Sequence, residues 1–242
     1  MDSDRRHSGT RVMFGRIARR YNLLNRLMTF GQDRVWRREA VRRLRVPPDA
    51  RLLDVGAGTG DLSAEALRHT KGTRVVAVDF SPEMITIGQR RLKGGRIQWL
   101  AADASHLPLR DASFEGVISG FLLRNVADVD RVLREQHRLL APGGRVVCLD
   151  TTAPGGGLLA PLLRFHRRKI IPLLGLTIAR DEPAYHYLAD STEAFLTGEA
   201  LADLMMAAGF RHVGFARRAL GSVAIHWGTK GPVNEATPNP SP

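Results

Sequence analysis

A buried strand that runs directly into a glycine-rich turn constrains this chain more than any other part of its sequence. Residues 52–60 read LLDVGAGTG, with glycine at every second position after the strand. Glycine permits a positive φ and lacks the side chain that would hold a neighbour away from the backbone, at an entropic cost. We therefore expect a ligand against Gly56, Gly58 and Gly60; the alternative is a tight strand-to-helix turn without one.

The glycine spacing and the acid before the turn narrow the choice of ligand. A dinucleotide site needs G-x-G-x-x-G and a phosphate loop needs G-x-x-x-x-G-K-[ST], whereas this turn has G-x-G-x-G. Asp54 precedes it, and residues 54–61 contain no lysine or arginine. A carboxylate suits an ammonium or sulfonium group better than a diphosphate. S-adenosylmethionine (SAM) carries both groups, so we expect Asp54 and the three glycines to bind SAM.

Apolar runs and helix signals alternate along the chain from residue 51 onward. We expect parallel strands at residues 51–55, 74–78, 97–101, 114–119 and 145–150, followed by a hairpin at 211–220 and 222–227. We expect helices at residues 61–69, after 81, at 128–140 and at 198–208, with Pro142-Gly143-Gly144 ending the third. This order predicts an α/β fold with a doubly wound, mostly parallel, seven-stranded Rossmann-like sheet. Its ligand should lie at the carboxyl ends of the strands.

Two aspartates follow predicted strands of this sheet. Asp79 ends the second strand, about 20 residues beyond the glycine turn, where its carboxylate can accept hydrogen bonds from both ribose hydroxyls. Asp103 follows the third strand and is placed to accept from the amine of an adenine. Each could instead cap a helix. The turn and both aspartates together are typical of a class I SAM-dependent methyltransferase, whereas a NAD dehydrogenase would need the other glycine spacing.

Composition indicates one large unit with short polar ends. We expect a disordered N-terminus at residues 1–10, a single methyltransferase domain at 11–230 and a disordered tail at 231–242. Within the domain, we expect residues 11–48 to form an N-terminal helical cap and 155–195 a helical lid insertion. The insertion is apolar and basic, which fits a lid that touches an anionic membrane surface. An ordinary helix with a solvated basic face is the alternative.

The net charge of +12 is concentrated in two flanking segments, residues 1–50 and 151–180. Such charge fits nucleic acid, an anionic membrane surface or an arginine-rich proteome. Aromatic residues make up only 6% of the chain, and no RNA-stacking motif is present. We therefore keep a basic RNA-binding protein as the non-enzyme alternative and expect neither a nucleic-acid partner nor a metal.

No apolar run reaches the roughly 18 residues of a membrane span, and the single cysteine fits a reducing compartment. We expect a cytoplasmic protein, peripheral at the inner face of the membrane, and leave monomer and homodimer open.

Several longer motifs give this chain a close family resemblance. Residues 13–25 read MFGRIARRYNLLN, residues 121–126 read FLLRNV, and residues 221–228 read GSVAIHWG. Over about residues 13–230 the chain resembles the ubiquinone/menaquinone-biosynthesis C-methyltransferases, which include the demethylmenaquinone methyltransferases. These motifs are more specific than the glycine turn, which many methyltransferases share.

The resemblance implies roles for particular residues. It implies SAM contacts from Thr59, Asp79, Asp103, Ala104 and Gly120, and a substrate face built from Tyr21, Arg124 and Asn125. This chain departs from the family pattern at Asn22, where aspartate is usual, and at Gly120, where serine is frequent. Leu122 stands where the family usually has glycine, which puts the shape of the substrate pocket in doubt.

The resemblance implies methylation of a quinol ring, and the chemistry of that step can be argued directly. A ring carbon becomes nucleophilic when a ring hydroxyl loses its proton, so the substrate should be the reduced quinol. Arg124 is permanently cationic and suits stabilisation of the phenolate, while Asn125 and Tyr21 can orient hydroxyls. A salt-bridged or surface arginine is the alternative for Arg124. We expect polyprenylated demethylmenaquinol as substrate, with the benzoquinol step of ubiquinone synthesis or another small lipophilic acceptor as alternatives. The resemblance thus implies an isoprenoid tail, which the predicted lid at 155–195 would receive.

Overall fold

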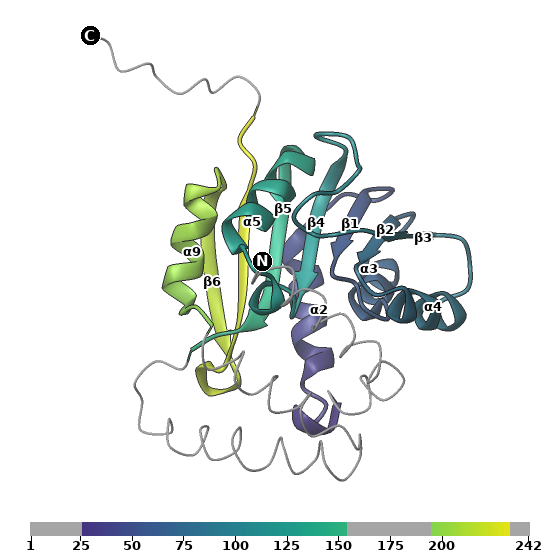
Figure 1. Ribbon diagram of the computed structural model, residues 1–242, viewed down its shortest axis with the longest axis horizontal. Helices are drawn as coiled ribbons and strands as arrows, with labels where there is room; N and C mark the ends of the chain where they lie inside the picture. The colour runs from purple at the N-terminus through teal and green to yellow at the C-terminus, as the bar shows by residue number, and fades with distance from the viewer. Residues whose placement is uncertain (1–25, 154–194, 233–242) are drawn as a thin grey trace.

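Seven strands of the chain pair into one sheet in the computed structural model, which describes residues 26–153 and 195–232 (Figure 1). The strands are β1 (Arg51–Val55), β2 (Arg74–Asp79), β3 (Ile97–Ala101), β4 (Phe114–Gly120), β5 (Leu140–Thr151), β6 (Arg211–Arg218) and β7 (Val223–Thr229). Their order in the sheet is β3-β2-β1-β4-β5-β7-β6. The first five strands run parallel, and β7 is antiparallel to both β5 and β6. The predicted doubly wound, mostly parallel sheet is therefore confirmed.

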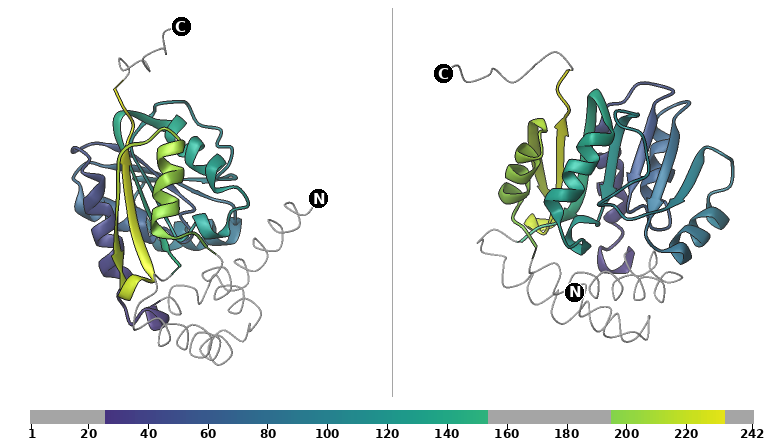
Figure 2. Two further views of the ribbon diagram at one scale, coloured as in Figure 1. Left: turned by 90° about the vertical axis from the view of Figure 1, so that its left-hand side faces the viewer. Right: turned by 45° about the horizontal axis from the view of Figure 1, so that its top comes forward.

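Helices cover both faces of this sheet. They are α2 (Asp33–Leu44), α3 (Asp61–His69), α4 (Pro82–Arg91), α5 (Val129–Leu139) and α9 (Gly198–Ala207). Helices α2 and α3 pack together on one face, and α5 and α9 pack together on the other (Figure 2). The side chains of Ser81, Asp128 and Thr197 each accept a backbone N–H in the first turn of α4, α5 and α9. These caps satisfy donors that a helix start leaves unpaired, which fixes where each helix begins.

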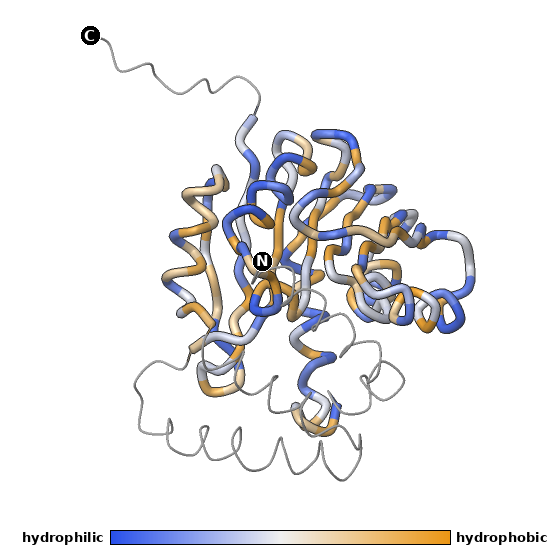
Figure 3. The backbone as a smooth tube through the Cα atoms, viewed as in Figure 1, coloured by the Kyte–Doolittle hydropathy of each residue, from blue (hydrophilic) through white to orange (hydrophobic). Residues whose placement is uncertain are grey.

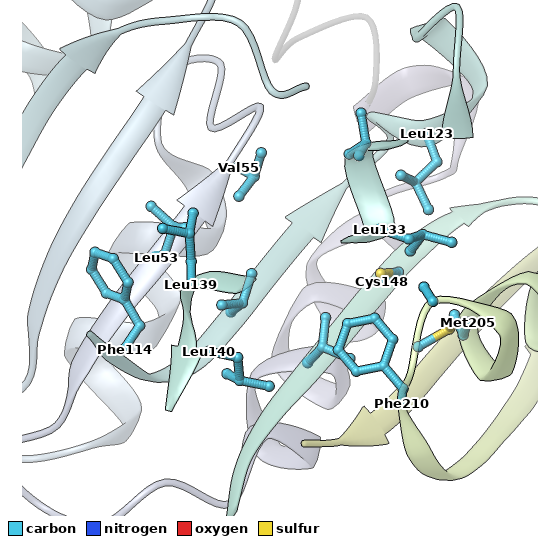
Figure 4. Packing of buried hydrophobic residues seen from close by; sticks show 14 of the residues in the cluster. Leu53, Val55, Phe114, Leu123, Leu133, Leu139, Leu140, Cys148, Met205 and Phe210 are labelled. Carbon is cyan, nitrogen blue, oxygen red and sulfur yellow. The ribbon is translucent and has the colours of Figure 1, made fainter. Parts of the chain in front are cut away.

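Each face of the sheet has its own apolar core because neighbouring residues of a strand point to opposite sides. In β1, Leu52 belongs to the cluster that includes Trp36 and Leu44 of α2. Leu53 belongs to the other cluster, with Leu133 of α5 and Met205 of α9 (Figure 4). The tube in Figure 3 shows much apolar colour along the central strands and mixed colour along the helices. Burying each such side chain contributes about 1.5–3 kcal/mol, so the strand ends that carry the loops are firmly held.

The Pro-Gly-Gly segment was predicted wrongly as the end of a helix before a strand at 145–150. Helix α5 ends at Leu139, and β5 starts immediately, at Leu140. Pro142-Gly143-Gly144 lies inside β5 as an irregularity: Phe114 pairs with Leu140, but Gly116 pairs with Arg145. Gly143 has a φ of +75°, and its N–H donates to the carbonyl of Lys230 at 2.9 Å. The backbone groups that the irregularity frees are thus paired with the strand end after β7.

Several predictions lie wholly or partly outside the described residues. They concern the disordered ends at 1–10 and 231–242, the lid at 155–195, Tyr21, and the part of the helical cap before residue 26. Helix α2 lies within the predicted cap at 11–48. Within residues 26–153 and 195–232, no helix has the length and apolar character needed to cross a membrane.

Candidate active site

A pocket opens at the carboxyl ends of the parallel strands, where doubly wound sheets bind ligands. It is lined by the loops after β1 to β4, by the start of α3 and by Arg37 of α2. Among the predicted site residues, the lining contains Gly56, Gly58, Thr59, Asp79, Asp103, Ala104, Gly120 and Asn125. Asp54, Gly60 and Arg124 do not line it, and Tyr21 lies outside the described residues. The fold thus brings together residues that are up to about 70 positions apart in sequence.

The three glycines of the turn differ in what surrounds the place where a side chain would stand. All three have a left-handed φ: +70° at Gly56, +56° at Gly58 and +83° at Gly60. A β-carbon on Gly56 would lie 2.7 Å from Leu122, and one on Gly60 would lie 2.7 Å from Trp99. A β-carbon on Gly58 would have no heavy atom within 4 Å. Protein side chains therefore fill the space beside the outer glycines, and only Gly58 faces open space where a ligand can lie.

Asp54 lies behind the turn and connects β1 to the start of α3. Gly60 occupies the N-cap position of α3 and has no side chain to accept a hydrogen bond. Asp54 Oδ2 serves as the cap acceptor instead. It accepts from the backbone N–H of Ser63 at 3.0 Å and from the Ser63 hydroxyl at 2.6 Å. Complete burial raises the pKa of Asp54 to about 7, against the hydrogen bonds from Ser63 that lower it. Its carboxylate shapes the turn from within the protein.

Asp79 is fixed by backbone donors on both of its oxygens. Oδ2 accepts from the N–H of Gly58 at 2.7 Å, and Oδ1 accepts from the N–H of Ser81 at 2.9 Å. Burial raises the pKa of this carboxyl, and these hydrogen bonds partly oppose the rise. One carboxylate thus links the turn after β1 to the start of α4, at the pocket wall. An oxygen that accepts one N–H keeps a second lone pair for a ligand hydroxyl.

Asp103 and Ala104 line the pocket beyond the end of β3. Oδ1 of Asp103 accepts from the backbone N–H of Ser105 at 2.8 Å and from its hydroxyl at 2.7 Å. These contacts form a local turn that fixes the carboxylate at the pocket edge. The sheet order places this residue at one end of the series β3-β2-β1-β4, next to the strand that carries Asp79.

The other end of the pocket is built by the residues that follow β4. Phe121 has a φ of +58°, which is unusual for an aromatic residue, and its N–H donates to the carbonyl of Leu149 at 2.7 Å. Its carbonyl accepts from the side-chain amide of Asn125 at 2.9 Å. Asn125 Oδ1 is buried and has no hydrogen-bond partner in the described part of the chain. Asn125 lines the pocket, and its Oδ1 is an acceptor for which the described residues supply no donor.

Arg124 forms a buried ion pair beside the pocket. Its Nη1 lies 2.6 Å from Oδ1 of Asp150, and the two side chains are 7% and 2% exposed. The guanidinium carbon also lies 5.1 Å from the centre of the Phe121 ring. This is the salt-bridged arrangement that was the alternative for Arg124. The Nε of Arg124 is buried without a partner among the described residues, so the pair with Asp150 leaves this buried donor unused.

Asp150 and Arg37 are two charged residues of this region that sequence reasoning missed. Asp150 comes near the carboxyl end of β5, so the rule that singled out Asp79 could have found it. Arg37 belongs to the Trp36-Arg37 pair, which is one of the motifs that carry the family resemblance, but no role was predicted for it. Only the packing of α2 against α3 and β4 brings it to the pocket wall.

The residues in place fit SAM. Gly58 leaves open space against the turn, and the two carboxylates at successive strand ends are acceptors that match the hydroxyl and amine donors of an adenosine. Asn125 adds a buried acceptor that has no partner among the described residues. Together with the strand order, this pocket defines a class I SAM-dependent methyltransferase.

Comparison with known proteins narrows that class to a family. Residues 3–230 match the ubiE/COQ5 methyltransferase family. The chain is 46% identical over 222 residues to the ubiquinone/menaquinone biosynthesis C-methyltransferase UbiE of Desulfotalea psychrophila, covering 92% of this chain and 90% of that protein. It is 41% identical over 220 residues to the demethylmenaquinone methyltransferase of Thermus thermophilus, covering 90% and 100%. The chain belongs to the ubiE/COQ5 methyltransferase family.

Solved structures confirm the fold at much lower identity. A SAM-dependent methyltransferase of Thermotoga maritima superposes with a TM-score of 0.66 at 22% identity, over 91% of this chain and 99% of that one. The [4+2]-cyclase SpnF superposes with a TM-score of 0.67 at 16% identity, over 92% and 95%. A cyclase on the same fold shows that the fold alone does not fix the reaction. The family match does, and the chain is a UbiE-family C-methyltransferase dependent on SAM.

Proposed function

We propose that this enzyme methylates the ring of demethylmenaquinol to give menaquinol, with SAM as the methyl donor. The observation that carries the proposal is the full-length similarity to relatives with that name. Those of Thermus thermophilus and Roseiflexus castenholzii align over 90% of this chain at 41% and 38% identity. The benzoquinol step of ubiquinone synthesis is the second candidate, because the relative with 46% identity carries both pathway names.

The pocket supports a specific assignment of SAM contacts. Asp79 accepts from the ribose hydroxyls, and Asp103 with Ala104 holds the adenine beyond β3. Thr59 and the glycine turn receive the methionine part, and Gly120 lies at the wall where β4 ends. The support for this assignment is that all of these residues line one pocket in the order of the strands that carry them. Asp54 contributes by holding the turn and α3 in place.

The reaction needs an electron-rich ring carbon. When a ring hydroxyl gives up its proton, the carbon can form a bond to the methyl of a sulfonium while the carbon–sulfur bond breaks and the sulfur leaves as a neutral thioether. Loss of the proton from the attacked carbon then restores the aromatic ring. When bound, SAM supplies the methyl group and the positive charge; the protein holds the two reacting carbons about 3 Å apart in line.

Arg124 and Asn125 are the residues proposed to act on the quinol. Asn125 Oδ1 has no partner among the described residues and lines the pocket, so it can orient a quinol hydroxyl. Arg124 is held by Asp150 and keeps a buried Nε–H, which can donate to a hydroxyl oxygen or to an ordered water. A fixed cation near a developing phenolate lowers the barrier without reorganisation of solvent. Tyr21 is proposed as the third member from the family pattern alone.

The isoprenoid tail of the substrate bears on where the enzyme works. We propose that it acts in the cytoplasm at the inner membrane surface, with the basic segments 1–50 and 151–180 toward anionic lipid. Residues 155–195 would then cover the tail. Cosedimentation with vesicles tests this: binding to anionic vesicles should exceed binding to neutral ones and fall with salt. Equal binding to both would contradict it.

Transfer of a labelled methyl group tests the reaction itself. Purified enzyme and labelled SAM are given demethylmenaquinol or the corresponding benzoquinol, each with and without reductant. We expect rapid methylation of demethylmenaquinol only in the reduced state. Preference for the benzoquinol would assign the enzyme to ubiquinone synthesis instead. Equal activity on the oxidised quinone would refute the phenolate argument.

A further inference from the structure

The pocket is mostly acidic, whereas SAM carries a carboxylate on its methionine part. Three carboxylates line it, those of Asp61, Asp79 and Asp103. They suit the sulfonium, the ammonium and the adenosine donors, but not the carboxylate of the methionine part. Among the described lining residues, Arg37 is the one cationic side chain.

Arg37 is held in place by Asp33 through only part of its N–H donors. It is a buried residue of α2, and its Nη1 bonds to Asp33 one turn earlier on the same helix. Its Nη2 lies 3.7 Å from Oδ2 of Asp61, too far for a good hydrogen bond. Asp61 is engaged by Arg91, whose Nη2 lies 2.5 Å from Oδ1. A guanidinium carries five N–H donors, so Asp33 fixes its orientation while other donors remain for an anion in the pocket.

The position of Arg37 along the pocket indicates which anion. The sheet order sets Asp103 beyond β3, Asp79 at the end of β2, the glycine turn after β1 and Phe121 after β4. A molecule with its adenosine at β3 and β2 reaches β1 and β4 with its amino-acid end. Helix α2 packs against β4, β5 and α3, so Arg37 enters at that end. The carboxylate of the amino acid is the anion available there.

We propose that Arg37 binds the carboxylate of SAM and that Asp33 is its positioning residue. The proposal rests on the assigned adenosine contacts of Asp79 and Asp103. Within the described lining, it gives the acidic pocket one cationic point, which sets the direction in which SAM lies. A ligand with the same adenosine, sulfonium and amine but no carboxylate should gain nothing from Arg37.

Decarboxylated SAM provides that ligand. Calorimetry gives Kd for SAM and for decarboxylated SAM with the wild type and with Arg37→Gln. We expect Arg37→Gln to weaken SAM by about 10- to 100-fold, as for loss of a charge-assisted hydrogen bond. Binding of decarboxylated SAM should change less than about 3-fold, which also reports that the variant is folded. Arg42→Gln removes the same charge from an exposed position on the same helix and should change neither Kd.

Equal losses for both ligands, or an unchanged Kd for SAM, would overturn the proposal. Arg37→Lys is the second variant, since it keeps the charge and loses the planar fork. It should bind SAM more weakly than the wild type yet still prefer SAM to decarboxylated SAM; no preference would also overturn the proposal. Asp79→Asn should weaken both ligands alike. Failure of the adenosine assignment is thereby distinguished from failure at Arg37.

Discussion

The buried pair of Arg124 and Asp150 offers the most direct test of the catalytic proposal. Arg124 Nη1 lies 2.6 Å from Asp150 Oδ1, and the side chains are 7% and 2% exposed, so water cannot take the place of a lost partner. Asp150→Asn leaves a buried guanidinium without its counter-charge. We expect the free energy of unfolding to fall by about 3–5 kcal/mol. Arg124→Met leaves a buried carboxylate unpaired and should cost a similar amount.

The double variant Arg124→Met/Asp150→Asn separates stability from catalysis. With both charges gone, the loss of stability should be smaller than the sum of the two single losses by at least about 2 kcal/mol. If Arg124 acts on the quinol, the double variant recovers stability but remains at least about 100-fold slower than the wild type. The exposed pair of Arg134 and Asp130, joined at 2.8 Å, is the control. Arg134→Met should cost less than about 1 kcal/mol.

Three measurements decide the outcome. Urea unfolding gives the stability of each variant, calorimetry gives the Kd for SAM, and labelled methyl transfer to demethylmenaquinol gives turnover. A loss below about 1 kcal/mol for Asp150→Asn would show that the pair does not hold a desolvated charge. A stable double variant with the turnover of the wild type would refute a catalytic role for Arg124.

Further predictions concern the glycine turn and its carboxylates. Gly58→Ala, at a φ of +56°, should weaken SAM binding at least about 10-fold by calorimetry, because its β-carbon enters the open space; unchanged binding would contradict this. Gly60→Ala should instead lower the melting temperature, because its β-carbon would lie 2.7 Å from Trp99. Asp79→Asn should raise the Kd for SAM by about 10-fold or more, and a wild-type Kd would remove Asp79 from the site. Asp54 has its pKa raised from 3.8 to about 7, so the folded protein holds a proton that the unfolded chain releases near pH 4. The protonated carboxyl therefore contributes its full stability below pH 4, and this contribution is lost as the pH rises to about 7. In urea unfolding from pH 5 to 8, the free energy of unfolding of Asp54→Asn should rise relative to that of the wild type. Parallel pH profiles for the two proteins would argue against the raised pKa.

The sequence predicted regular elements well where the local signal and the packing agree. Strand β1, helix α3 and strand β3 have the bounds expected for them, because each is a short apolar run or an amphipathic turn of the right period. The start of β5 was wrong because proline and two glycines are ordinary signs of a loop. There, pairing of Gly143 and Gly144 with the strand end at Lys230 overrides the local preference.

The candidate site could be predicted to the extent that it follows from strand order. Asp79 and Asp103 end or follow strands, so a parallel sheet alone brings them to one edge. Arg37 and the partner of Arg124 depend on how a helix and a distant strand pack, which neither spacing nor periodicity records. The contacts of Asp54 show the same limit: its place beside the turn was clear, but its bond to Ser63 at the start of α3 was not.

Leu122 shows how a departure from the family pattern takes on meaning only in the fold. The family usually has glycine there, so the leucine predicts a changed substrate pocket. In the structure its Cδ1 lies 2.7 Å from the place where a β-carbon on Gly56 would stand, and Leu122 lines the pocket. The space left by Gly56 is therefore filled by a side chain from the segment after β4. Glycine at position 122 would open that space to the pocket, so Leu122 narrows the pocket at the end where Asn125 lies, and Gly58 alone leaves the turn free for a ligand.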